Sequence, residues 1–126
     1  MSVHGLDHVQ VAAPREPCVE ERARAFYAEL LGLAEIEKPE ALRSKGGVWF
    51  SLGRGELHVG LEDDFRPALK AHPALAVSGL DELRARLEAE GHVTLEAEEI
   101  PDARRFYVSD PFGNRLEIIE RMEVPW

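Results

Sequence analysis

The clearest pattern of hydrophobic and polar positions lies near the C-terminus, in residues 104–120. Two β-rich runs flank residues 110–114 (DPFGN), whose proline and glycine supply the backbone angles that a chain reversal needs. In the second run Leu116 and Ile118 share one face while Glu117 points to the other, because side chains of a strand alternate. This stretch predicts a β-hairpin that carries a carboxylate, Glu117, among apolar neighbours.

A weaker copy of this pattern occupies residues 47–62. It has the same plan of strand, glycine-containing turn and strand, and the dipeptide LH at 57–58 falls where LE falls at 116–117. The offset between these dipeptides is 116 − 57 = 59 residues. Two glycines that would end helical stretches, Gly32 and Gly91, are also 91 − 32 = 59 residues apart. The chain therefore reads as strand, helix, strand, strand, strand, written twice.

The same periodicities place the other elements. In the first predicted strand, residues 6–13, the side chains of His8 and Gln10 share the polar face. Residues 20–31 and 81–90 have apolar side chains at helical spacing and are predicted helices. The remaining predicted strands are residues 33–38, 48–52, 56–62, 72–77 and 92–96.

These elements predict an α+β fold in which two βαβββ modules form a curved mixed sheet with a concave cup for a metal or ligand. The whole chain, residues 1–126, is expected to be a single domain. Module one covers residues 5–62, a linker 63–70, and module two 71–121, followed by a tail that contains Trp126.

The composition of the chain indicates which classes of binding partner to expect. The chain of 126 residues has 24 acidic and 15 basic residues and a net charge of −9, which opposes the phosphate backbone of nucleic acids. No apolar run is long enough to span a bilayer, and the N-terminus lacks the regions of a signal peptide. We expect a cytoplasmic protein with a small-molecule partner, without nucleic acid or membrane. Cys18, the single cysteine, has no partner for a disulfide or a cysteine-based metal site.

The alternation of side chains along the predicted strands also places candidate metal ligands on one face of the sheet. Strand geometry directs His8, His58 and Glu117 to the predicted cup, and His72 joins them as the repeat equivalent of His8. Imidazole and carboxylate ligands suit a divalent ion, namely Zn, Ni, Mn, Co or Fe, and two histidines with one carboxylate leave positions open for substrate. His58 is the candidate fourth ligand or general base, since its ordinary pKa suits proton transfer near neutrality.

A structural interpretation competes with this one. A histidine at the end of a strand is commonly a surface or hydrogen-bonded residue, and Glu117 could pair with Arg115 or Arg121. The repeat favours the metal site because it relates the candidate positions to one another.

The segments LDHVQVA (residues 6–12), AFYAELLG (25–32), HPALAV (72–77) and FYVSDPFGNRLE (106–117) resemble the vicinal oxygen chelate superfamily. This superfamily includes glyoxalase I, bleomycin-resistance proteins, fosfomycin-resistance transferases and extradiol dioxygenases. The resemblance covers nearly the whole chain, and its motifs are specific for the fold but not for the reaction.

The resemblance implies metal ligands at His8, His72 and Glu117. Glyoxalase-like members have a fourth ligand, usually Glu, on the strand that corresponds to residues 56–62. Here the repeat offset selects His58, with Glu62 as the alternative, and this departure weakens an assignment as glyoxalase I itself.

Further residues are candidates for contact with substrate. Gln10 and Trp49 belong to strands that form the walls of the predicted cup, and Arg105 could attract an anionic substrate. Tyr107 resembles the tyrosine that contacts phosphonate oxygen in fosfomycin-resistance enzymes; an ordinary aromatic pair with Phe106 is the alternative.

The leading functional hypothesis is a divalent-metal-dependent enzyme of lyase or isomerase type whose small substrate chelates the metal through adjacent oxygens. The alternatives are a metal-free binding and sequestration protein of the bleomycin-resistance type and an Fe(II) extradiol-type dioxygenase. By analogy with the superfamily we also expect a homodimer, with the cup formed within one chain or across two.

Overall fold

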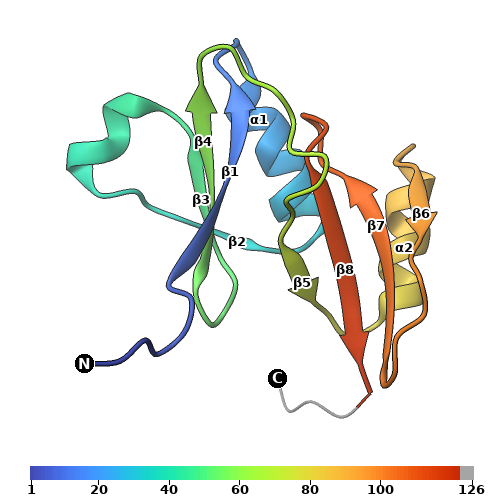
Figure 1. Ribbon diagram of the computed structural model, residues 1–126. Coiled ribbons are helices and arrows are strands. Elements are labelled where there is room, and N and C mark those ends of the chain that lie inside the picture. Colours follow the sequence, from blue (N-terminus) through green and yellow to red (C-terminus); the bar gives the residue numbers. More distant parts are fainter. Residues whose placement is uncertain (123–126) are drawn as a thin grey trace. The chain divides into compact units, whose positions relative to one another are not determined.

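The computed structural model describes residues 1–122, and the chain divides into two compact units between Arg66 and Pro67. Each unit contains a four-stranded mixed sheet with helical segments (Figure 1). The predicted α+β class and the plan of two βαβββ modules are confirmed. Most of the predicted tail, including Trp126, lies outside the described residues.

In unit 1 the sheet has the strand order β1-β4-β3-β2, with β1 parallel to β4 and the other pairs antiparallel. The order along the chain is β1 (His8–Pro14), α1 (Val19–Ala23), η1 (Arg24–Leu30), β2 (Ala34–Ile36), η2 (Glu40–Lys45), β3 (Val48–Ser51) and β4 (Glu56–Glu62). The segment η2 is a 3₁₀ helix in a stretch for which the sequence predicted no helix or strand.

The helix predicted over residues 20–31 is α-helical only in its first part, because η1 is a π-helix. There the N–H of Leu31 donates to the carbonyl of Phe26 at 3.0 Å, one residue further back than in an α-helix. Phe26 and Tyr27 are fully buried, and the ring of Tyr27 lies 5.6 Å from that of Phe50 in β3. Leu30 and Leu31, which a 3.6-residue period places on the apolar face of this helix, are only partly buried.

In unit 2 the strand order is β5-β8-β7-β6, so both sheets are built alike. The chain order is β5 (Ala74–Ala76), α2 (Leu80–Ala89), β6 (Thr94–Glu96), β7 (Ala103–Ser109) and β8 (Arg115–Arg121). β5 and β6 are shorter than the predicted strands 72–77 and 92–96, and His72 lies just before β5.

One face of each sheet is packed with buried apolar side chains. In unit 1 the buried side chains include Phe50, Leu57 and Val59, and Figure 1 shows α1 on one side of this sheet. In unit 2 Phe106 and Ile118 are fully buried in the same way. Burial of each such side chain stabilises the fold by about 1.5–3 kcal/mol. The opposite faces carry the candidate site residues, of which His58 and Glu117 are also buried.

The turn predicted between β7 and β8 is present, and a buried carboxylate holds it. Asp110 Oδ1 accepts hydrogen bonds of 2.9 Å from the backbone N–H groups of Phe112 and Asn114. Gly113 has φ +93°, which a residue with a Cβ rarely adopts. Asn114 Oδ1 in turn accepts from the N–H of Ala68 at 3.0 Å, which ties the segment before β5 to the turn.

Among residues 1–122, no helix combines the length and the apolar character that crossing a membrane requires.

Candidate metal and substrate site

The polar face of the unit 1 sheet carries a stack of three rings. The parallel register of β1 and β4 sets His8 opposite Glu56 and Gln10 opposite His58. The imidazoles of His8 and His58 stack with centroids 4.2 Å apart, and the indole of Trp49 stacks on the other side of His58 at 3.7 Å. His58 is only 3% exposed as a result. The structure thus brings His8 and His58 together, as the alternation predicted.

Carboxylates orient both imidazoles. His8 Nδ1 donates to Asp7 Oδ1 at 2.8 Å, so its Nε2 is the nitrogen available to a ligand. His58 Nε2 donates to Glu56 Oε1 at 2.8 Å, so its Nδ1 is the nitrogen that can take up a proton or a metal. A carboxylate behind a metal-binding imidazole is the usual arrangement, because it fixes the tautomer and the ring plane.

Glu56 is a candidate that the sequence reasoning missed. That reasoning weighed His58 and Glu62 for the fourth ligand position, but the register sets Glu62 opposite Pro14, at the other end of β1 from His8. Glu56 lies directly opposite His8 and contacts His58. The signal was present in the alternation of β4, since Glu56 and His58 are two residues apart and share a face.

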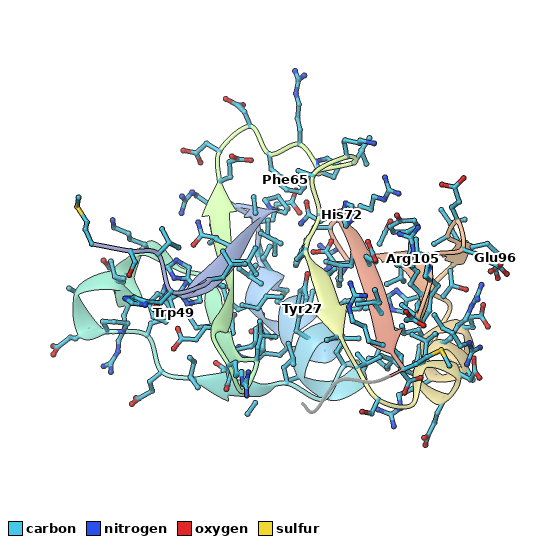
Figure 2. The ribbon with its side chains drawn as sticks, turned by 60° about the horizontal axis from the view of Figure 1, so that its bottom comes forward. Tyr27, Trp49, Phe65, His72, Glu96 and Arg105 are labelled. Carbon is cyan, nitrogen blue, oxygen red and sulfur yellow. The ribbon has the colours of Figure 1, made fainter. Side chains whose placement is uncertain are left out.

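In unit 2 the structure joins His72 to Glu117. His72 Nδ1 lies 2.9 Å from the backbone carbonyl oxygen of Lys70, and His72 Nε2 lies 3.1 Å from Glu117 Oε1. The side chain of Glu117 is 10% exposed and that of His72 25%. His72, which Figure 2 labels, lies two residues before β5 begins.

Arg105, predicted as a substrate contact, lies against this pair. Its Nη1 is 3.5 Å from Glu117 Oε2 and donates to the hydroxyl of Tyr107 at 3.0 Å. The backbone carbonyl of Glu98 accepts from the same guanidinium at 3.1 and 2.6 Å. Glu117 therefore meets an arginine, as the structural interpretation required, but the arginine is Arg105. The guanidinium of Arg115 instead lies 3.9 Å over the ring of Tyr107.

The two units repeat this arrangement position by position. Trp49 pairs with His58 across β3 and β4, and Tyr107 pairs with Glu117 across β7 and β8. In the parallel pairs, Gln10 faces His58 and Ala74 faces Glu117. His8 and His72 each lie two residues before those parallel partners, so the repeat predicted from sequence holds at the level of register.

A divalent ion suits these donors. Among the residues that the structure describes, no group of three or more His, Cys, Asp or Glu is placed to hold a metal, and each unit supplies a pair. A backbone carbonyl only accepts, so the Nδ1 of His72 carries a hydrogen. A neutral His72 then directs the lone pair of Nε2 at a carboxylate, and a proton or a metal ion between them removes the repulsion.

The side chain of Gln10 occupies space that is open because residue 60 is a glycine. A Cβ added at Gly60 would be 2.8 Å from Nε2 of Gln10, closer than real Cβ contacts. Gly60 therefore allows the amide of Gln10 to lie flat on the sheet beside Trp49, where both residues line one groove. The amide is available there to orient a bound molecule.

Comparison with known proteins supports the fold and the family. The family model of the Glyoxalase/Bleomycin resistance protein/Dioxygenase superfamily matches residues 5–118. A glyoxalase family protein from Bacillus anthracis is 50% identical, with 96% of this chain and 98% of that chain covered and a TM-score of 0.89.

More distant structures share the fold alone. They include lactoylglutathione lyase from Agrobacterium tumefaciens (20% identity, 94% and 95% of the two chains covered, TM-score 0.72). They also include a fosfomycin resistance protein from Listeria monocytogenes (17% identity, 94% of each chain covered, TM-score 0.73). No curated protein matches the sequence. With nearly its whole length matched, the chain belongs to the Glyoxalase/Bleomycin resistance protein/Dioxygenase superfamily.

Proposed function

We propose that this protein is a divalent-metal-dependent enzyme of lyase or isomerase type, acting on a small substrate that chelates through adjacent oxygens. The observation that carries the proposal is the geometry of His72. Its Nδ1 is fixed by a backbone carbonyl while its Nε2 faces the carboxylate of Glu117 at 3.1 Å. Such a pair favours a cation between its members.

The proposed ligands are His8, His72 and Glu117, with His58 or Glu56 in the fourth position. Nitrogen and carboxylate donors suit Zn, Ni, Mn, Co or Fe. When bound, such an ion polarises a substrate oxygen and acidifies nearby protons. Both His8 and His72 have Nδ1 engaged, which leaves Nε2 of each for this role.

In this proposal His58 is the general base that transfers a proton of the substrate. Glu56 holds the Nε2 hydrogen, and the stacked rings of Trp49 and His8 fix the imidazole plane. His58 Nδ1 can then accept a proton from a carbon or oxygen acid and return it. Gln10 and Tyr107, on the polar faces of their sheets, would orient the substrate.

Metal content tests the proposal. Protein purified without chelator should contain a divalent metal, and His72→Ala and Glu117→Gln should each lower the content or raise the Kd at least about tenfold, because each removes a ligand. His92→Ala serves as the matched control, since His92 lies outside both pairs. Unchanged metal content in both ligand variants would refute the proposal.

A second candidate function is metal-free binding and sequestration. Arg105 lies 3.5 Å from Glu117 and already offers that carboxylate a positive charge. Beside Tyr107 lies a groove of about 490 Å³ whose lining includes the apolar side chains of Leu69, Val93 and Leu95. Metal-free protein that still binds ligands would favour this function, whereas iron with uptake of dioxygen would favour an extradiol-type dioxygenase.

We also propose a homodimer. β2 is an edge strand of the unit 1 sheet, and an unpaired edge is commonly covered by another chain. Sedimentation equilibrium over a concentration series should give twice the chain mass of 14.1 kDa. A mass equal to one chain at every concentration would exclude the dimer.

A further inference from the structure

A second groove lies in unit 1, on the polar face of the sheet and under the loop that precedes β3. Its volume is about 530 Å³. Trp49, labelled in Figure 2, forms part of its wall, so the groove borders the ring stack of Trp49, His58 and His8. The lining residues are Gln10, Arg15, Lys38, Leu42, Lys45, Gly46, Trp49, Val59, Gly60 and Leu61.

The charge of this lining is opposite to that of the protein. Arg15, Lys38 and Lys45 contribute three cations, and no carboxylate belongs to the lining, although the net charge of the chain is −9. The side chain of Lys45 forms no hydrogen bond or ion pair among residues 1–122, so its ammonium group is available. The Nε of Arg15 donates to Asp63 in an exposed pair that water screens.

The loop that carries Lys38 and Lys45 is anchored at both ends. Lys38 Nζ donates to the carbonyl of Gly46, which joins the two ends of the η2 segment. The N–H of Gly47 donates to Glu20 Oε2 at 3.0 Å. A Cβ at Gly47 would lie 2.2 Å from the carbonyl oxygen of Val59, so only glycine allows this close approach to β4. The groove is thus built into the fold of unit 1.

We propose that this groove binds the anionic end of a small organic molecule, a carboxylate or a phosphate-type group, while the body of the molecule lies against Trp49. Lys45 and Lys38 supply the charge, and the amide of Gln10 supplies a hydrogen bond. Anion binding by this groove does not depend on the proposed function. Only the further step, that the bound anion is the substrate of the enzyme, rests on it. Binding itself uses residues of unit 1 that are not metal ligands.

Indole fluorescence provides the measurement. In a Trp126→Phe background Trp49 is the remaining tryptophan, and the probes are benzoate, phenylphosphonate and the neutral benzamide. Both anions should change the emission with a Kd at least about tenfold lower than that of benzamide, and the Kd should rise with salt because the attraction is screened. Equal binding of benzamide and the two anions would overturn the inference. The stronger of the two anions identifies the group as carboxylate or phosphate-type.

Variants of one lysine assign the charge. Lys45→Ala should raise the Kd of the better anion about tenfold, the loss of one charge-assisted contact, and Lys45→Arg should largely retain binding. Arg54→Ala is the matched control, because Arg54 is an exposed cation of unit 1 outside the groove. Circular dichroism checks that each variant is folded. An equal Kd for Lys45→Ala and the control would overturn the inference.

The metal proposal and this inference can fail separately. Anion binding should persist in EDTA and in the His72→Ala variant. If the protein proves metal-free but still binds the anions through Lys45, only the metal proposal falls. If anion binding disappears in both EDTA and His72→Ala, the anion is bound at the metal and this inference falls.

Discussion

His72 is held at Nδ1 by a backbone carbonyl, and this single hydrogen bond decides what its other nitrogen can do. Sequence reasoning placed His72 and Glu117 in one site, because both follow from the repeat. The same reasoning could not find Arg105 beside Glu117, since two side chains on neighbouring strands meet only when their register is known. Glu56 was missed for a different reason. The repeat offset pointed to His58, although alternation put both residues on one face.

Substitution of Arg105 should strengthen metal binding. Arg105→Ala removes a positive charge 3.5 Å from Glu117 that repels an incoming cation, so the Kd for Zn²⁺ or Ni²⁺ should fall about tenfold. Titration calorimetry measures this change. Arg104→Ala is the control, because Arg104 lies on the same strand but pairs with Asp81. A weaker affinity in Arg105→Ala would show that the arginine supports the site instead.

At the scale of elements, regular alternation predicted β1, β4, β7 and β8 well, because each has seven residues, which is long enough for the alternation of side chains to show. The short strands β5 and β6 and the 3₁₀ segment η2 were less predictable, since three to six residues carry little periodicity. The basic groove was hidden for the same reason. Its cations, Arg15, Lys38 and Lys45, come from a loop and a connection that have no pattern in common.

The anchor between α1 and the loop before β3 should make stability depend on pH. The N–H of Gly47 stabilises the carboxylate of Glu20 and lowers its pKa below the ordinary value of 4.5; burial opposes this, and Arg24 and Lys38 reinforce it. A lowered pKa in the folded state adds stability above the unfolded pKa, and this is lost as pH falls through the folded value.

Glu20→Gln should therefore lower the free energy of unfolding at pH 7 by about 1 kcal/mol, a charged hydrogen bond discounted for partial exposure. The difference from the parent protein should shrink as pH falls from about 5 towards 3. Urea denaturation across this range measures it, with the exposed Glu21→Gln as control. A difference that stays constant with pH would show that Glu20 acts through packing.

At the scale of the whole molecule, the family and the two-module plan were predictable because the motifs cover nearly the entire chain. The composition predicted the acidic balance but not its local reversal in the groove of unit 1. The repeat does not predict how many metal ions the chain binds. Each unit has its own pair of candidate ligands, so the pairs can share one ion or hold one ion each.

Metal stoichiometry should decide this count. If both pairs hold one ion, titration calorimetry should give one ion per chain, and His8→Ala and His72→Ala should each abolish tight binding. Two ions per chain, with one lost in each variant, would show that the pairs act independently. Metal-induced thermal stabilisation should follow the same pattern, since a ligand stabilises the state that binds it.

The matching register of the two sheets has a practical consequence for protein engineering. Trp49 and Tyr107 occupy equivalent positions of the two sheets, and so do His58 and Glu117, so an exchange within either pair changes the side chain at a matched position of the register. The unchanged unit then serves as the reference for a substitution made in the other unit, and the effects of the two side chains can be compared within one polypeptide.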